Sequence, residues 1–189
     1  MTLANKITLT RIALIPIIVI LMVIGGFGCT VAALVLFILT SVTDFLDGYV
    51  ARKYNQVTDF GKFVDPLADK LLVTAAMCMF VQQGLMEGWM VFIILAREFI
   101  ITSLRTIAAM KGTAMAAAYS GKVKTCVQIA GIIIIFLCSI LIQAGSASLE
   151  TLTLWYHTVG LVMTLVTVDS GYDYLKRNWD LIADGTTKK

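Results

Sequence analysis

An uncharged stretch of 32 residues, residues 12–43, decides the fold of this chain: IALIPIIVILMVIGGFGCTVAALVLFILTSVT. A transmembrane helix needs about 20 apolar residues, so this stretch is too long for one ordinary span. The cluster Gly25-Gly26-Phe27-Gly28 interrupts it, because glycine favours turns over the interior of a helix. The stretch therefore predicts two membrane-spanning helices joined by a tight turn.

The composition of the whole chain also indicates a membrane protein. Of the 189 residues, 59% are hydrophobic and only 14% are charged, and the mean hydropathy is +0.88. Soluble domains are nearer to about half apolar and about a quarter charged, and disordered chains are more polar still. Further apolar stretches bring the number of expected spans to six: 71–86, 88–110, 125–149 and 151–168.

We therefore predict an all-α integral membrane protein that forms a single domain over residues 1–189. Residues 11–175 would form a core of six transmembrane helices, and residues 176–189 a cytoplasmic tail. Residues 1–10 would form a short amphipathic helix that lies at the membrane surface ahead of the first span.

The distribution of positive charge predicts the orientation of these helices. The loops expected on one side of the membrane, near 25–30, 84–88 and 145–150, contain no Lys or Arg. All 15 Lys and Arg residues belong to the opposite side or to helix ends that face it. Because positively charged loops are retained in the cytoplasm, both termini and the two longer charged loops are expected there.

Four aspartates lie where the second and third spans approach the cytoplasmic side. Asp44 and Asp47 are three residues apart and Asp65 and Asp69 are four apart, so each pair shares one face of a helix. Gathered carboxylates repel one another unless cations compensate their charge. Oxygen ligands suit the hard divalent cations Mg²⁺ or Mn²⁺, and four aspartates could hold two ions. Two metal ions beside a membrane suggest phosphoryl transfer on a phosphate-bearing substrate.

A simpler interpretation is that these aspartates are solvated or paired with neighbouring cations. Candidate partners are Arg52, Lys53, Lys62 and Lys70. Two observations favour the metal site instead. The four carboxylates occupy only two helix faces, and Gly48 and Gly61 flank them where a ligand could approach the backbone closely.

The spacing of the aspartates resembles the signature of the CDP-alcohol phosphotransferase family, D-x2-D-G-x2-A-R-x8-G-x3-D-x3-D. All eight fixed positions match: Asp44, Asp47, Gly48, Ala51, Arg52, Gly61, Asp65 and Asp69. Members of this family are membrane enzymes with six helices. They transfer a phosphatidyl or phospho-group from a CDP-linked donor to an alcohol and release CMP.

The resemblance implies a role for each matched residue. Asp44, Asp47 and Asp65 would bind the metal ions. Asp69 would bind metal or act as the general base on the acceptor hydroxyl. The remaining four positions would accommodate and bind the CDP group: Gly48, Ala51, Arg52 and Gly61.

Basic residues outside the signature bear on the acceptor. Arg97 lies inside the fourth expected span with Arg105 two turns further on, and Gly121-Lys122-Val-Lys124-Thr125-Cys-Val-Gln128 opens the fifth. A cation within a membrane helix is costly unless it meets an anion. One interpretation is that Glu98 pairs with one of the arginines. The other is a basic pocket that binds the phosphate of a phosphorylated acceptor.

These segments, together with Asn5-Lys-Ile-Thr8-Leu-Thr-Arg11, resemble a bacterial branch of the family that uses glycerol-3-phosphate. The resemblance covers residues 3–128. It implies transfer of the phosphatidyl group of CDP-diacylglycerol to sn-glycerol-3-phosphate, giving phosphatidylglycerophosphate and CMP. Arg97, Arg105 and Lys122 would then hold the acceptor phosphate. Asn5 and Thr8 would line the donor side, where Arg11 would lie too unless it is an interfacial residue.

The resemblance further implies a homodimer in the plasma membrane of a bacterium, in contact with lipids and with its active site facing the cytoplasm. No partnership with nucleic acid is expected. Two alternatives remain open. The same chemistry could use an inositol phosphate or phosphatidylglycerol as acceptor. A cation transporter is less favoured, because the acidic residues gather near one side and the outer halves of the spans are almost entirely apolar.

Overall fold

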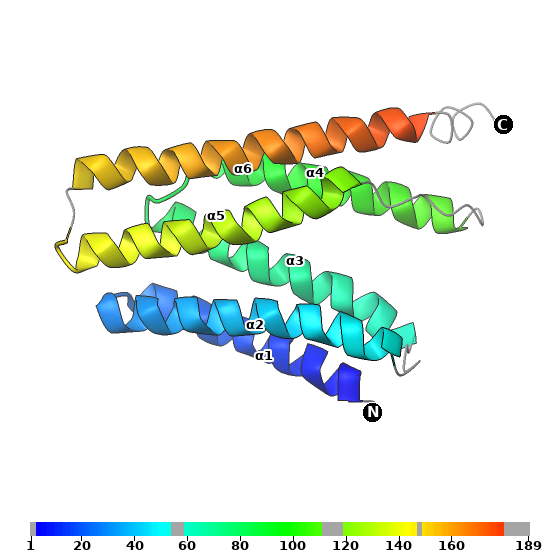
Figure 1. The fold of residues 1–189 in the computed structure, drawn as a ribbon, viewed down its shortest axis with the longest axis horizontal. Coiled ribbons are helices and arrows are strands. Elements are labelled where there is room, and N and C mark those ends of the chain that lie inside the picture. Colours follow the sequence, from blue (N-terminus) through cyan, green and yellow to red (C-terminus); the bar gives the residue numbers. More distant parts are fainter. Residues whose placement is uncertain (1–2, 54–58, 111–118, 147–148, 180–189) are drawn as a thin grey trace.

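The computed structural model describes residues 3–53, 59–110, 119–146 and 149–179 (Figure 1), with only the backbone described at 3–7, 44–53, 59–66, 69, 149 and 151. The described chain is all-helical, as predicted. Its six helices are α1 (Leu3–Ile24), α2 (Phe27–Lys53), α3 (Asp59–Gln82), α4 (Gly88–Met110), α5 (Tyr119–Gln143) and α6 (Leu149–Arg177).

The helices run up and down between two ends of the molecule. They contain between 22 and 29 residues, which at 1.5 Å per residue corresponds to roughly 33–44 Å. Figure 1 shows the start of α1 and the end of α6 at the end of the bundle where α2 and α4 finish and where α3 and α5 begin. The turns after α1, α3 and α5 lie at the opposite end. Each helix is thus long enough to cross the hydrocarbon core of a bilayer, which is about 30 Å thick.

The glycine cluster that interrupts the long uncharged stretch forms the turn between α1 and α2, as predicted. Gly25 and Gly26 have φ angles of 70° and 82°. These angles lie in the left-handed region that side chains with a Cβ rarely adopt. The amide of Gly25 still donates to the carbonyl of Leu21 at 3.1 Å, which closes the last turn of α1.

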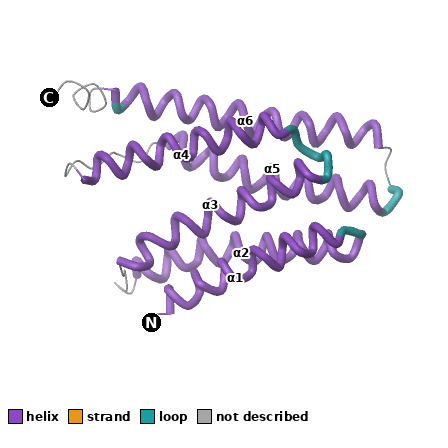
Figure 2. The backbone as a smooth tube through the Cα atoms, turned by 180° about the vertical axis from the view of Figure 1, so that it is seen from behind, coloured by secondary structure: helices purple, strands orange, loops and turns teal. Residues whose placement is uncertain are grey.

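The helices form a bundle in which α1 packs against α2 and α3, while α6 packs against α4 and α5. Helix α5 also contacts α2 and so joins the two groups (Figure 2). At this junction Phe136 of α5 meets Phe37 of α2 and Phe80 of α3, with ring centroids 5.9 Å and 4.9 Å apart. All three rings are fully buried, so the aromatic contacts fix how the two groups of helices pack.

The outer surface of the bundle is apolar. Large hydrophobic side chains are exposed on every helix, and Phe92 and Leu154 each expose 71% of their surface. Soluble monomers rarely expose contiguous apolar surface on this scale. Two helical segments in the described chain, Tyr119–Gln143 and Leu152–Arg177, are long and apolar enough to cross a membrane. These features are consistent with a membrane protein.

One expected element differs in the structure. The sequence predicts a separate surface helix over residues 1–10, but the described backbone continues without a break from Leu3 to Ile24 as helix α1. The physical reason is that no glycine or proline occurs before Pro16, so nothing interrupts the hydrogen-bond ladder at Arg11.

Close packing between α5 and α6 depends on Gly131, and substitution to alanine tests it. A Cβ there would overlap Sδ and Cγ of Met163, which is 1% exposed and has little room to move. We expect Gly131→Ala to cost about 1–3 kcal/mol by overpacking, measured as a lower Tm in detergent. Gly28→Ala is the matched control, because a Cβ at Gly28 meets nothing within 4 Å. A Gly131→Ala protein that melts with the wild type would contradict this packing.

Candidate active site

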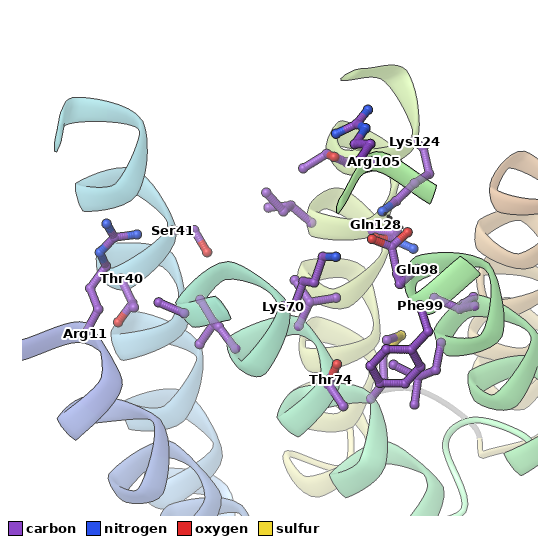
Figure 3. A pocket seen from close by; sticks show the side chains of 18 residues that line it. Arg11, Thr40, Ser41, Lys70, Thr74, Glu98, Phe99, Arg105, Lys124 and Gln128 are labelled. Atoms are coloured by element: carbon purple, nitrogen blue, oxygen red, sulfur yellow. Dashed lines mark hydrogen bonds and ion pairs between the residues drawn. The ribbon is translucent and has the colours of Figure 1, made fainter. Parts of the chain in front are cut away.

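A cavity of about 300 Å³ opens between the two groups of helices. Its lining residues come from α1, α2, α3, α4 and α5 (Figure 3). Four cations and one carboxylate are among the charged side chains that line it: Arg11, Lys70, Arg105, Lys124 and Glu98. The excess of positive charge makes the cavity suited to an anionic ligand.

Glu98 binds two cations at this cavity. Its Oε1 lies 2.6 Å from Nζ of Lys124 and 2.9 Å from Nη1 of Arg97. The side chains of Lys124, Arg97 and Glu98 are only 7%, 13% and 16% exposed. We refer to these three residues as the Glu98 ion cluster. Because charges so poorly hydrated are costly, the carboxylate is what allows the two cations to be buried.

The other cations approach the cavity from separate helices. Arg11 of α1 is 4% exposed and lies across the cavity from the Glu98 ion cluster, beside Thr40 of α2 (Figure 3). Lys70 of α3 donates a hydrogen bond to the hydroxyl of Thr102 on α4. These positions surround the space with positive charge rather than lining one wall with it.

Arg105 is held by an aromatic residue of α6. Its Nε donates to the hydroxyl of Tyr174 at 3.1 Å, and its guanidinium carbon lies 5.1 Å from the centroid of the same ring. This distance is within the range of a cation–π contact. The guanidinium therefore keeps a defined position although the residue as a whole is exposed.

A neutral side chain completes the polar wall on α5. Gln128 follows Lys124 by four residues and so lies on the same face of the helix. It is 3% exposed and donates from Nε2 to the Thr167 hydroxyl at 3.1 Å. Its amide oxygen adds a hydrogen-bond acceptor beside the cation Lys124.

The four predicted aspartates lie on helix turns that adjoin this cavity. Asp44 follows the lining residue Thr40 by one turn of α2, with Asp47 one turn beyond it. Asp65 and Asp69 fall on α3 on either side of the lining residue Ala68. The side chains of all four lie outside the described residues. No group of three or more metal-ligating side chains occurs among those that are described.

Other predicted donor-site residues have the same status. The side chains at Asn5, Ala51 and Arg52 lie outside the described residues. At Gly48 and Gly61 only the helical backbone is described. Thr8 is described and is 2% exposed, three residues before Arg11 on the same face of α1.

Of the three residues predicted to hold an acceptor phosphate, the structure brings only Arg105 to the cavity. Arg97 is not among the lining residues; it pairs with Glu98 and donates to the Ser170 hydroxyl at 2.8 Å. Lys122 is exposed and does not line the cavity. Lys124 lines it instead, because two residues along a helix rotate a side chain by about 200°. Its i, i+4 spacing to Gln128 is the sequence signal that marks this face.

Comparison with known proteins relates the chain to enzymes of lipid metabolism. The family profile of the CDP-alcohol phosphatidyltransferases matches residues 1–166. The chain is similar to the CDP-diacylglycerol–glycerol-3-phosphate 3-phosphatidyltransferase of Bacillus subtilis (strain 168), at 44% identity over 95% of this chain and 96% of the relative. The enzyme of the same name from Rickettsia bellii is 37% identical over 92% and 93%. A probable phosphatidylglycerophosphate synthase of Mycobacterium tuberculosis is 32% identical over 93% and 80%.

The Glu98 ion cluster can be tested through stability. Glu98→Gln removes the carboxylate that, among the described residues, pairs with two buried cations, and we expect a loss of about 3 kcal/mol or more in the free energy of unfolding. The double variant Glu98→Gln/Lys124→Met removes one of the two uncompensated cations as well and should recover part of this loss. Thermal unfolding in detergent measures both.

Arg177→Ala provides the control for this experiment, since it removes an exposed pair in which Nε lies 2.7 Å from Asp173 Oδ1. Exposed pairs contribute little, so its Tm should stay near that of the wild type. If Glu98→Gln were as stable as this control, the cluster would not be what holds α4 and α5 together.

Proposed function

The chain belongs to the CDP-alcohol phosphatidyltransferase family, and from this membership we propose the reaction that it catalyses. The phosphatidyl group of CDP-diacylglycerol passes to sn-glycerol-3-phosphate, giving phosphatidylglycerophosphate and CMP. The observation that carries the proposal is the cavity lined by four cations next to the turns of α2 and α3 that bear the signature aspartates. Similarity to relatives named for this reaction over nearly the whole chain supports it.

The enzyme acts in the plasma membrane of a bacterium, with all six helices as spans. The apolar exposed surface and the bacterial relatives support this placement. Both termini and the cavity face the cytoplasm, in agreement with the distribution of Lys and Arg. Lipid tails of the donor then enter between helices while the polar acceptor arrives from the water. A homodimer is the assembly that the family resemblance favours.

The signature aspartates fit a divalent metal site. Asp44 and Asp47 are carried by the end of α2 and Asp65 and Asp69 by the beginning of α3, and these helix ends meet at one end of the bundle (Figure 1). A donor set of carboxylate oxygens alone suits Mg²⁺ or Mn²⁺, and four carboxylates suffice for two ions. When bound, the metal supplies positive charge that neutralises the pyrophosphate and stabilises CMP as leaving group.

Residues around the aspartates bind the donor. Gly48, Ala51 and Gly61 leave room for the nucleotide beside the helices, since none carries a side chain larger than a methyl group. Arg52 pairs with a phosphate of the CDP group, for which a guanidinium is suited by its forked donors. Asn5 and Thr8 contribute polar groups from α1 on the same side.

The acceptor phosphate binds among the cations of the cavity. Arg105 belongs to the set predicted from sequence, and we add Arg11, Lys70 and Lys124 because all three line the same space. Charge-assisted hydrogen bonds from several helices would orient glycerol-3-phosphate with its free hydroxyl toward the aspartates. Arg97 then acts through Glu98 rather than on the phosphate directly.

The transfer itself needs one proton acceptor. The acceptor hydroxyl oxygen attacks the phosphorus that bears diacylglycerol, a new P–O bond forms, and the P–O bond to CMP breaks. Asp69 accepts the hydroxyl proton as general base. The cationic wall keeps the acceptor in line for attack, which is the positioning that phosphoryl transfer mainly requires.

Release of CMP by the purified protein tests the reaction. With CDP-diacylglycerol and Mg²⁺, we expect CMP only when glycerol-3-phosphate is supplied, and none with inositol phosphate, serine or phosphatidylglycerol. Asp69→Asn should lower kcat by about 100-fold or more, because it removes the general base. Release with another acceptor would refute the proposed acceptor and keep the transfer chemistry. No release with any acceptor, from folded protein that binds Mg²⁺, would overturn the enzyme proposal.

Kinetics of single variants can identify the phosphate-binding cations. We expect Lys124→Met and Arg105→Ala each to raise the KM for glycerol-3-phosphate about ten- to a hundredfold, with the KM for CDP-diacylglycerol little changed. Lys122→Met should have the smaller effect, since Lys122 does not line the cavity. Lys176→Gln, an exposed cation at the end of α6, is the control. A larger effect at Lys122 than at Lys124 would contradict this assignment and would support Lys122, the residue predicted from sequence, as the one that binds the acceptor phosphate.

A further inference from the structure

One face of α6 carries polar side chains in the middle of a hydrophobic bundle. Thr167, Ser170 and Tyr174 follow one another at intervals of three and four residues, so they share a face. Each of them is at most 1% exposed. These residues lie beyond residue 166, where the match to the family profile ends. Buried polar groups of this kind need partners, and their partners show what the face does.

The partners are residues of the candidate active site. Thr167 accepts a hydrogen bond from Gln128, Ser170 accepts one from Arg97, and Tyr174 accepts one from Arg105. Gln128 and Arg105 line the cavity, and Arg97 belongs to the Glu98 ion cluster next to it. No residue of α6 is among the described residues that line the cavity. Helix α6 therefore binds side chains of the candidate active site, although none of its described residues lines the cavity.

Tyr174 has the geometry of a support for Arg105. Its hydroxyl accepts from Nε at 3.1 Å while its ring lies under the guanidinium, with the carbon 5.1 Å from the centroid. The bond uses Nε, so it leaves both terminal Nη groups available for a bidentate contact with an anion.

Tyr174 is itself fixed by its surroundings. It packs with Ile101 of α4 in a small buried cluster, and its backbone carbonyl accepts from Nδ2 of Asn178 at 2.8 Å. A long arginine side chain loses considerable rotamer entropy when it binds a ligand. Holding Arg105 in one conformation before the ligand arrives removes part of that cost.

We propose that Tyr174 is a positioning residue that orients Arg105 for the phosphate of the acceptor. The inference rests on the proposed function and extends it to a helix whose polar residues carry no signature motif. Since Tyr174 acts through Arg105, it affects the binding of the acceptor. It leaves the binding of the donor and the rate of the transfer step unchanged. Loss of the hydroxyl alone should weaken the support while the ring keeps its packing.

Steady-state kinetics of Tyr174→Phe in detergent test this proposal. We expect the KM for glycerol-3-phosphate to rise about three- to tenfold, which corresponds to the loss of one hydrogen bond. The kcat, the KM for CDP-diacylglycerol and the Tm should stay close to wild type. Tyr172→Phe is the matched control, because Tyr172 lies on the same helix with 66% of its surface exposed. Tyr174→Met, which removes the ring as well, should raise the same KM further.

A double-mutant cycle separates positioning from a general structural effect. In the Arg105→Ala background, Tyr174→Phe should cause no further increase in the acceptor KM, because the group on which it acts is gone. An unchanged KM in both Tyr174 variants, or an equal increase with and without Arg105, would overturn the proposal. Since the wild type would still turn over in both cases, these results would not contradict the proposed function. Absence of turnover in the wild type would instead refute the proposed function.

Discussion

The contact on which the polar end of this bundle depends is the pairing of Glu98 with Lys124 and Arg97. Two cations lie among helices whose surroundings offer little hydration, and a single carboxylate oxygen lies within 2.9 Å of both. Without Glu98 the two charges would repel each other and would be expelled toward water. With it, α4 and α5 are tied together near the cavity, and Arg97 extends the same network to Ser170 of α6. At this end of the bundle, three helices are thus linked through one carboxylate.

The apolar and polar halves of the bundle are specified by different interactions. Toward the turns at Gly25 and Gly84 the helices meet through close packing, with Phe37, Phe80 and Phe136 at the centre. Packing contacts of this kind accept different apolar side chains but tolerate little change in side-chain volume. Toward the opposite end the helices separate around the cavity, and hydrogen bonds replace packing. A tightly packed half can hold the open half in place, which is the rigidity that an ordered polar site requires.

How much could be predicted from the sequence depends on whether the signal is local. The break at Gly25-Gly26 is local, and it was predicted correctly. Pairing of Glu98 with an arginine was one of two open alternatives, and the structure has it with Arg97. By contrast, Lys124 rather than Lys122 lines the cavity because packing of α5 against α2 and α6 sets the rotation of that helix. Tyr174 could not be assigned either, since its partner lies 69 positions away in the chain.

Electrostatics explains why such a cavity would select a phosphorylated acceptor. Four cations around about 300 Å³ repel one another, and Glu98 compensates only part of their charge. A second carboxylate paired with these same cations would lower their mutual repulsion further, but it would also compete with a ligand phosphate for the same donors. Glu98 is the one acid among the described lining residues, so a dianion still gains by binding to the remaining cations. A neutral or zwitterionic alcohol brings no net charge to offset the repulsion, so its binding lacks that gain. Discrimination then arises from the charge balance of the site as well as from its shape.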